Sequence, residues 1–321
     1  MTRVHVWGAA GYAASEAIRL IALHPRLELG VLESRSMAGH DLAEASPLLR
    51  RIDRRFEPSG SVLAAAREGD IVIAAGGEGE ALEIAPHVLL RGARMVDLSA
   101  DHRFSNAAVY GLTEWNGYAI ARAALVANPG CYPTAALLAL LPLASLGEPT
   151  EIIVDAKSGI TGAGRNPKTA SLFAEVSGEI RAYGLEGHRH QPEIEGRLRI
   201  AGIAAPVTFT PHVVPLARGM LADVYAVFAD ALDASSVRAA YARAYVRSPF
   251  VRLLDALAPS VAAVAGTNDA EICVTVHGRV VRAICAIDNL GKGAAGQAVA
   301  NINLMCGFAE ELGFHDRAIV A

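Results

Sequence analysis

The first third of the chain alternates short apolar runs with amphipathic stretches. From Ala14 the apolar residues recur with helical spacing, and Pro25 ends the predicted helix. Four apolar runs predict strands, at residues 4–7, 27–32, 70–75 and 95–98. Strands that alternate with helices are typical of βαβ units with a parallel sheet. We therefore expect a doubly wound, Rossmann-type α/β domain at the start of the chain.

The pattern changes in the second half of the chain, where strands with period-two alternation predominate. They are predicted at 207–209, 223–228, 271–276 and 280–287. The last two flank His277-Gly278, a hairpin signal, so we expect an antiparallel or mixed sheet in a second, α+β domain. A glycine-rich stretch then leads into a helix over 297–305, which we expect to return to the first domain. The predicted domains are thus 1–130 plus 290–321, and 131–289.

Composition and charge narrow the class of protein. The 321 residues are 52% hydrophobic and 19% charged, which excludes disorder. The formal net charge of −4 arises from 29 basic and 33 acidic residues without a long run of one sign, so we expect no nucleic-acid partner. No apolar run approaches the ~20 residues of a membrane helix, and the N-terminus lacks a signal-peptide pattern. We expect a cytoplasmic protein without a membrane partner.

A glycine-containing loop follows the first predicted strand, with Gly8, Gly11 and Ala14 at GxxGxxA spacing. Only small residues let backbone N–H groups approach a pyrophosphate at a helix N-terminus. We therefore expect the loop to bind a dinucleotide through Gly8, Ala10, Gly11 and Tyr12. The alternative is a tight structural turn, since this spacing departs from GxGxxG.

The end of the second predicted strand should select the cofactor. Glu33 suits the ribose hydroxyls of NAD, whereas Ser34, Arg35 and Ser36 form a donor set that suits the 2′-phosphate of NADP. We favour NADP(H), because strand ends are uncertain by a few residues. The alternative is a solvated surface loop.

Cys131 is the candidate nucleophile. It precedes the strong helix formers of 135–141, so it should lie at a helix N-terminus, where the dipole and free N–H groups favour the thiolate. Gly130 permits a sharp turn, and Pro133 suits the first turn of a helix. The remaining cysteines lie in apolar patterns and are expected to behave as small hydrophobes: Cys273, Cys285 and Cys306. No CxxC pair or disulfide framework is present.

Histidines in the segment 188–193 are the candidate acid–base groups. His188 and His190 are followed closely by Glu193, and a thiol that works with a dinucleotide needs an acid–base nearby. A metal held by this pair with His212 or Glu193 is the alternative, which we disfavour because no HExxH motif is present. We expect no metal site.

Two further polar segments could approach a ligand. Arg103 follows a sheet strand at its carboxyl end, where it could bind a phosphate or a carboxylate, and a buried structural ion pair is the alternative. Ser158 and Gly159 open a second glycine-rich loop, which could approach a cofactor or substrate through its backbone or form a turn.

Five segments together resemble the semialdehyde dehydrogenase family over nearly the whole chain, and specifically its arginine-biosynthesis branch. They are 128–134, 158–165, 188–194, 211–219 and 289–296. The resemblance implies NADPH-dependent reduction of an acyl phosphate through a cysteine thioester, with Cys131 as nucleophile and His188 as acid–base. It also implies that Asn289 lies near the cofactor.

The chemistry implied by the resemblance suggests further site residues and partners. Arg103 and Asn128 are the candidates for holding the leaving phosphate, and His190, Glu193 and Arg218 are further substrate-binding candidates. We expect a small acyl-phosphate substrate, inorganic phosphate and a homodimer or homotetramer.

Three alternatives stay open at this point. The related lysine-biosynthesis reductase acts on a carrier-bound substrate, but its cysteine segment lacks the Pro-Gly-Cys-Tyr-Pro run found at 129–133. Aspartate-semialdehyde dehydrogenase is a more distant relative. A redox-sensing NADP-binding regulator without turnover would be a different class of protein, and the presence of both Cys131 and His188 argues against it.

Overall fold

The computed structural model describes residues 1–165 and 169–314, which form two compact units. Unit 1 consists of Met1–Gly130 together with the described residues from Ala294 onward, and unit 2 consists of Cys131–Gly293. Residues 315–321, which belong to the predicted first domain, lie outside the described residues. Among the described residues, no helix is long and apolar enough to cross a membrane.

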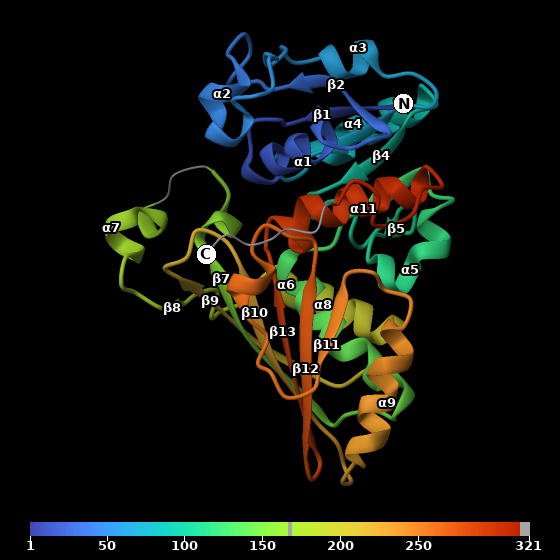
Figure 1. Cartoon of the computed structure of the whole chain (residues 1–321), viewed down its shortest axis with the longest axis vertical. Coiled ribbons are helices and arrows are strands. Elements are labelled where there is room, and N and C mark those ends of the chain that lie inside the picture. Colours follow the sequence, from blue (N-terminus) through green and yellow to red (C-terminus); the bar gives the residue numbers. More distant parts are fainter. Residues whose placement is uncertain (166–168, 315–321) are drawn as a thin grey trace. The chain divides into compact units, whose positions relative to one another are not determined.

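Unit 1 is a parallel six-stranded sheet with strand order β2-β1-β3-β4-β6-β5 (Figure 1). Its strands are β1 (Thr2–Trp7), β2 (Leu27–Glu33), β3 (Ile71–Ala74), β4 (Arg94–Asp97), β5 (Val109–Tyr110) and β6 (Leu125–Ala127). Its helices are α1 (Tyr12–Ala22), α2 (Leu42–Ala45), α3 (Ser61–Ala65), α4 (Glu80–Leu90), α5 (Thr113–Ile120) and α11 (Gly296–Met305), with a 3-10 turn at Pro47–Leu49. The predicted doubly wound α/β fold is confirmed.

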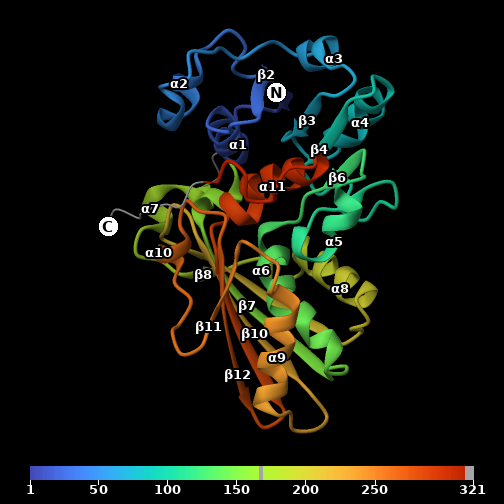
Figure 2. The ribbon, with the colours of Figure 1, turned by 45° about the vertical axis from the view of Figure 1, so that its right-hand side comes forward.

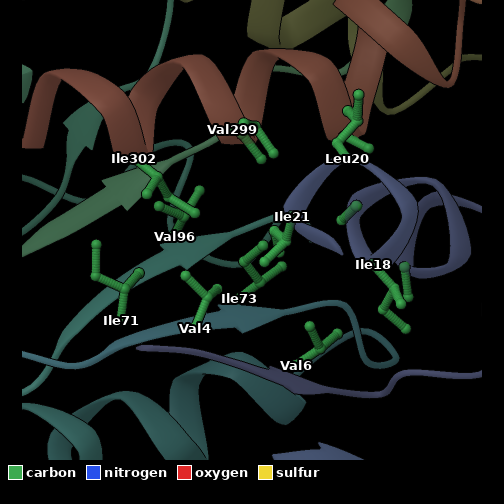
Figure 3. Packing of buried hydrophobic residues seen from close by; sticks show 14 of the residues in the cluster. Val4, Val6, Ile18, Leu20, Ile21, Ile71, Ile73, Val96, Val299 and Ile302 are labelled. Carbon is green, nitrogen blue, oxygen red and sulfur yellow. The ribbon is translucent and has the colours of Figure 1, made fainter. Parts of the chain in front are cut away.

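Both faces of this sheet are covered, as β3 illustrates, because all four of its residues are buried. Ile71 and Ile73 belong to one apolar cluster, and Val72 and Ala74 belong to the cluster on the opposite face. Helices α1 and α11 supply side chains to the first cluster, as Figure 3 shows for Ile18, Ile21, Val299 and Ile302. Helix α11, which comes from the end of the chain, is therefore part of the core of unit 1. Each Val or Ile side chain that it buries fully contributes ~1.5–3 kcal/mol to stability.

Unit 2 is a seven-stranded mixed sheet with strand order β11-β12-β13-β10-β7-β9-β8. Its strands are β7 (Glu151–Gly159), β8 (Arg181–Ala182), β9 (Val207–Val214), β10 (Met220–Val227), β11 (Val251–Leu254), β12 (Ala270–His277) and β13 (Val280–Ile287). Its helices are α6 (Cys131–Leu140), α7 (Phe173–Val176), α8 (His190–Ile200), α9 (Ala234–Tyr245) and α10 (Val261–Val264). Shorter 3-10 turns lie at Leu141–Ser145, Ile160–Ala163 and Thr169–Ser171, and a short π-helix at Gly291–Ala295.

Helices α6, α8 and α9 lie along one face of this sheet (Figure 2), and the strands alternate accordingly. In β10 every second residue is buried, and the residues between them are half-exposed on the other face. The hairpin of β12 and β13 is antiparallel as predicted. Strand β9 was predicted to be antiparallel. It is antiparallel to β8, but the prediction is wrong for its other neighbour, because β9 pairs in parallel with β7. The connection between these two strands contains α8, a crossover that parallel pairing requires.

Candidate active site

Cys131 is the first residue of α6, as predicted from the helix formers that follow it. Its side chain is partly exposed, whereas the other nine residues of the helix are all buried. The helix dipole stabilises a thiolate at this position. Cys131 is therefore accessible and electrostatically favoured as a nucleophile.

Gly293 lies directly against Cys131. A Cβ atom placed on Gly293 would lie 2.8 Å from the Cβ of Cys131 and 3.2 Å from the carbonyl oxygen of Asp288. Such distances are shorter than carbon atoms tolerate, so the packing around the thiol requires glycine at this position. The short π-helix that contains Gly293 thus forms one wall beside the nucleophile.

The ring of His188 is held in a cluster of aromatic side chains. Its centroid lies 5.8 Å from that of Tyr132, 5.4 Å from that of Phe209 and 4.9 Å from that of His190. The backbone N–H of His190 donates to Nδ1 of His188 over 3.1 Å. This bond leaves the proton of the neutral ring on Nε2. Burial lowers the pKa of His188 below its ordinary value of 6.5, and the positive charge of the Arg189 guanidinium lowers it further.

The rings of Tyr132 and Tyr183 both pack on that of His188, and Tyr132 follows Cys131 in the sequence. The Tyr183 hydroxyl donates to the Tyr132 hydroxyl over 3.3 Å, and the Tyr132 hydroxyl donates to the His212 carbonyl oxygen over 3.0 Å. Burial raises the pKa of Tyr132 far above its usual range, and the neighbouring Tyr183 raises it further. Neither tyrosine was among the predicted site residues, although Tyr132 is the immediate neighbour of Cys131 in the sequence.

His190 and Glu193 lie in the first turn of α8 and are both buried. His190 also faces Tyr132, with 5.8 Å between the ring centroids. Their positions agree with a place beside the nucleophile, and their substrate-binding role stays a prediction. The described residues contain no group of three or more His, Cys, Asp or Glu side chains that could hold a metal ion.

Asn289 ties together three loops of unit 2. Its amide Nδ2 donates to the Thr161 hydroxyl over 3.0 Å, and its Oδ1 accepts from the backbone N–H of Gly219 over 2.6 Å. A Cβ on Gly159 would lie 2.9 Å from the Cα of Arg218, so these loops approach backbone to backbone. The structure therefore brings together Ser158, Gly159, Arg218 and Asn289, and their binding roles stay predictions.

Arg218 is already engaged by an acidic group. Its Nε donates to Oδ2 of Asp288 over 2.7 Å, and the Asp288 side chain is fully buried. Oδ1 of Asp288 also accepts from the backbone N–H groups of Leu290 and Gly291. Arg218 thus stabilises the turn that leads to Gly293, and its contact with substrate stays a prediction.

The glycine loop of unit 1 packs closely against a neighbouring loop at Gly8. Gly8 has a φ of +77°, and a Cβ on it would lie 2.7 Å from the backbone of Ala75 and Gly76. Gly11 is the N-cap of α1 and provides no side-chain cap, and the first turn of α1 contains no acidic residue. The loop after β3, at Ala75 and Gly76, therefore lies against the glycine loop. This second loop was not among the predicted site segments.

The conflict between Glu33 and Arg35 is resolved by their surroundings. Glu33 is buried, and its carboxylate accepts the backbone N–H of Val62 over 2.8 Å, in the first turn of α3. The Arg35 side chain is 85% exposed, beside the exposed Ser36. Ser34 is buried, and its hydroxyl accepts the backbone N–H of Met37. Glu33 thus serves the fold, whereas the Arg35 side chain is largely exposed, and its contact with a 2′-phosphate stays a prediction.

Arg103 and Asn128 are buried within unit 1 and bind each other. Arg103 Nε donates to the Asn128 carbonyl oxygen over 3.0 Å, and Nη2 donates to that of Leu98 over 3.1 Å. The Asn128 amide donates to the Ala294 carbonyl oxygen and accepts from Asn301. These contacts fix the backbone before the nucleophile, and the proposed phosphate-holding role of both residues stays a prediction.

Comparisons with known proteins agree with these features. Residues 3–123 match the family model "Semialdehyde dehydrogenase, NAD binding domain", and residues 131–289 match "Semialdehyde dehydrogenase, dimerisation domain". The N-acetyl-gamma-glutamyl-phosphate reductase of Syntrophobacter fumaroxidans is 42% identical, with 98% of each chain covered. The enzyme of the same name from Moorella thermoacetica is 40% identical, with 97% of each chain covered.

Solved structures show the same fold at low sequence identity. Aspartate semialdehyde dehydrogenase II from Vibrio cholerae, complexed with ASA, has a TM-score of 0.76 at 18% identity and covers 96% of this chain and 98% of its own. Aspartate semialdehyde dehydrogenase from Candida albicans, crystallised with NADP, has a TM-score of 0.74 at 15% identity and covers 96% and 99%. These two proteins share the fold of this chain.

The fold and the matched family domains define a dinucleotide-dependent dehydrogenase. Unit 1 has a glycine loop before α1, and unit 2 has a cysteine as the first residue of α6. The chain belongs to the semialdehyde dehydrogenase family, in the group of the N-acetyl-gamma-glutamyl-phosphate reductases. The predicted resemblance is confirmed.

Proposed function

We propose that this enzyme reduces N-acetyl-γ-glutamyl phosphate with NADPH to N-acetylglutamate 5-semialdehyde and inorganic phosphate, a step of arginine biosynthesis. The observation that carries the proposal is the partly exposed Cys131 at the start of α6, next to Tyr132, whose ring packs on His188. The relatives that share this name align over nearly the full length of both chains, which supports the substrate class.

Cys131 forms and releases the covalent intermediate. Its thiolate attacks the acyl carbon, the bond from that carbon to the phosphate oxygen breaks, and inorganic phosphate leaves with the bonding electrons. An acyl thioester remains on Cys131. After reduction of this thioester, the C–S bond of the hemithioacetal breaks, the aldehyde leaves and the thiolate is restored.

The cofactor supplies the reducing equivalents, since bound NADPH provides a hydride for the thioester carbonyl carbon. The residues proposed to hold it are Gly8, Ala10, Gly11 and Tyr12 at the pyrophosphate, and Ser34, Arg35 and Ser36 at the 2′-phosphate. Gly8 fits this role because a side chain there would close the loop against Ala75. Ser158, Gly159 and Asn289 are the proposed contacts in unit 2.

His188 is the proposed acid–base. Its Nδ1 accepts the His190 N–H, so Nε2 is the nitrogen that can exchange a proton with the substrate oxygen. Protonation of the ring at Nδ1 breaks the bond from the His190 N–H, and the imidazolium then gives its Nε2 proton to the oxyanion that develops during reduction. The neutral ring that results carries its proton on Nδ1 and can take a proton back at Nε2 in the reverse reaction. Its lowered pKa makes the imidazolium a stronger acid.

Phosphate and acyl-group recognition is assigned to Arg103, Asn128, His190, Glu193 and Arg218. The role of His190 is supported by its ring contact with Tyr132, and Glu193 is buried in the first turn of the same helix. Arg103 and Asn128 act in this proposal mainly by fixing the backbone that precedes Cys131, since both are engaged with protein atoms.

Two copies of the chain are proposed to pair through the half-exposed face of the unit 2 sheet, in a homodimer or a dimer of dimers. Arg282 and Asp223 on that face form an ion pair at 2.6 Å, so covering this pair does not isolate either of the two charges. Ile284 lies on the same face as Arg282, and Ile284→Asp should dissociate the assembly in light scattering.

The decisive experiment is phosphate-dependent reduction of NADP by three aldehydes. We expect turnover with N-acetylglutamate semialdehyde and little with its aminoadipate homologue or with aspartate semialdehyde. Preference for either of the other aldehydes would refute the substrate assignment, and turnover with none would support the regulator alternative. We place the protein in the cytoplasm, because the mechanism needs a reduced thiol at Cys131 and a reducing compartment maintains it.

A further inference from the structure

An ion pair lies beside the residues assigned to the 2′-phosphate. Nη2 of Arg35 is 3.6 Å from Oε1 of Glu80, and their side chains are 85% and 33% exposed. Glu80 is the first residue of α4, and Arg35 follows the end of β2. The guanidinium that should meet the phosphate therefore already faces a carboxylate from another element.

The position of Glu80 is fixed by its second oxygen. Oε2 accepts the backbone N–H of Gly77 over 3.0 Å, in the glycine-rich loop after β3. A Cβ on Gly76 would lie 2.5 Å from the same oxygen, so this loop closes tightly around the carboxylate. Oε1 is thereby held toward Arg35.

Helix α4 does not need the charge of Glu80 at its start. The Asp101 carboxylate already accepts the backbone N–H groups of Gly79 and Ala81, over 2.9 and 3.0 Å. A second acid adds little to a helix N-terminus that a first acid already occupies. Arg35 is thus the natural partner of the Glu80 charge.

We propose that Glu80 is a specificity-tuning residue that competes with the 2′-phosphate of NADP(H) for the Arg35 guanidinium. The inference rests on the proposed function, in which Arg35 binds that phosphate. A phosphate placed on Arg35 displaces Oε1 or remains close to it, and both groups are negative. Glu80 therefore weakens NADP(H) binding selectively and speeds its release, whereas NAD(H), which lacks the phosphate, is indifferent to it.

The test is Glu80→Gln, which removes the charge and keeps an oxygen that can accept the Gly77 N–H. Calorimetric titration should show NADPH bound about two- to five-fold more tightly, the range expected for an exposed ion pair. Stopped-flow measurements should assign the gain mainly to slower dissociation, and NADH affinity should not change. Glu83→Gln is the matched control, since Glu83 is an exposed acid in the first turn of the same helix.

A double-mutant cycle separates the two levels of the proposal. If Arg35→Ala weakens NADPH and NADH equally, the assignment of Arg35 to the phosphate fails. A second outcome is that Arg35→Ala weakens the binding of NADPH but not of NADH. In that case the role of Glu80 alone is refuted if Glu80→Gln leaves the NADPH affinity unchanged, or if it raises the NADH affinity by the same factor. In the Arg35→Ala background, Glu80→Gln should no longer tighten NADPH, and unchanged melting temperatures should accompany each variant.

Discussion

Substituting Gly293 by alanine tests whether the π-helical turn positions the nucleophile. The new Cβ would lie 2.8 Å from the Cβ of Cys131, whereas carbon atoms rest at about 3.5–4.0 Å, so a displacement of about 1 Å is required. The carbonyl oxygen of Asp288, 3.2 Å from the same Cβ, limits retreat of the turn. The buried residues of α6 hold the helix body, so we expect the strain to move the thiol.

The expected result is a loss of turnover without a loss of fold. A misplacement of ~1 Å costs roughly 10²-fold in rate, whereas the overpacking costs about 1–3 kcal/mol of stability. The assay is kcat for phosphate-dependent oxidation of N-acetylglutamate semialdehyde, with thermal melting and NADPH titration on the same samples. Gly117→Ala is the control, because its nearest contact would be an ordinary 3.7 Å from Leu304. Near-normal kcat in Gly293→Ala would refute the reasoning.

Three further outcomes follow from the site and from unit 1. Cys131→Ser should bind NADP normally without turnover. In the unmodified enzyme, peptide mass spectra should show that iodoacetamide alkylates Cys131 much faster than the other cysteines. Acylation by substrate at any other residue would overturn the mechanism. His188→Asn should lower kcat by roughly 10²–10⁴ while cofactor binding persists, and the same loss in His190→Asn alone would reassign the role. Burial lowers the pKa of His24 below 6.5, so the unfolded chain binds more protons and the free energy of unfolding should decrease as pH falls below 6.5. In denaturant titrations His24→Gln should flatten this dependence, and an unchanged slope would contradict it.

Local signals in the sequence predicted the elements that depend on neighbouring residues. The start of α6 at Cys131 follows from helix formers and Pro133 within ten residues, and the β12–β13 hairpin follows from its turn. The parallel pairing of β9 with β7 was not predicted, because β7 is a distant segment and the alternation of Glu151–Gly159 was not interpreted as a strand.

The site was predictable as a set of chemical groups, whereas their surroundings were not. Glu33 and Arg35 both suit a dinucleotide in sequence, and only the N–H of Val62, 29 positions away, shows that Glu33 is occupied. Tyr183 gives no signal of its own until its hydroxyl meets that of Tyr132. Such contacts are set by tertiary packing, which periodicity does not encode.

The contribution of α11 to the core of unit 1 affects how the chain folds during synthesis. Strands β1 to β6 leave the ribosome first, but Val299, Ile302 and the Asn301 amide that binds Asn128 arrive only after all of unit 2. At roughly 5–20 residues per second, the ~175 residues from Gly130 to Met305 take about 9–35 s. During that interval one apolar face of the first sheet is covered by α1 but lacks α11, the second helix that packs on it. A messenger truncated before codon 296 should therefore yield an aggregation-prone N-terminal fragment and an intact fold for residues 131–293.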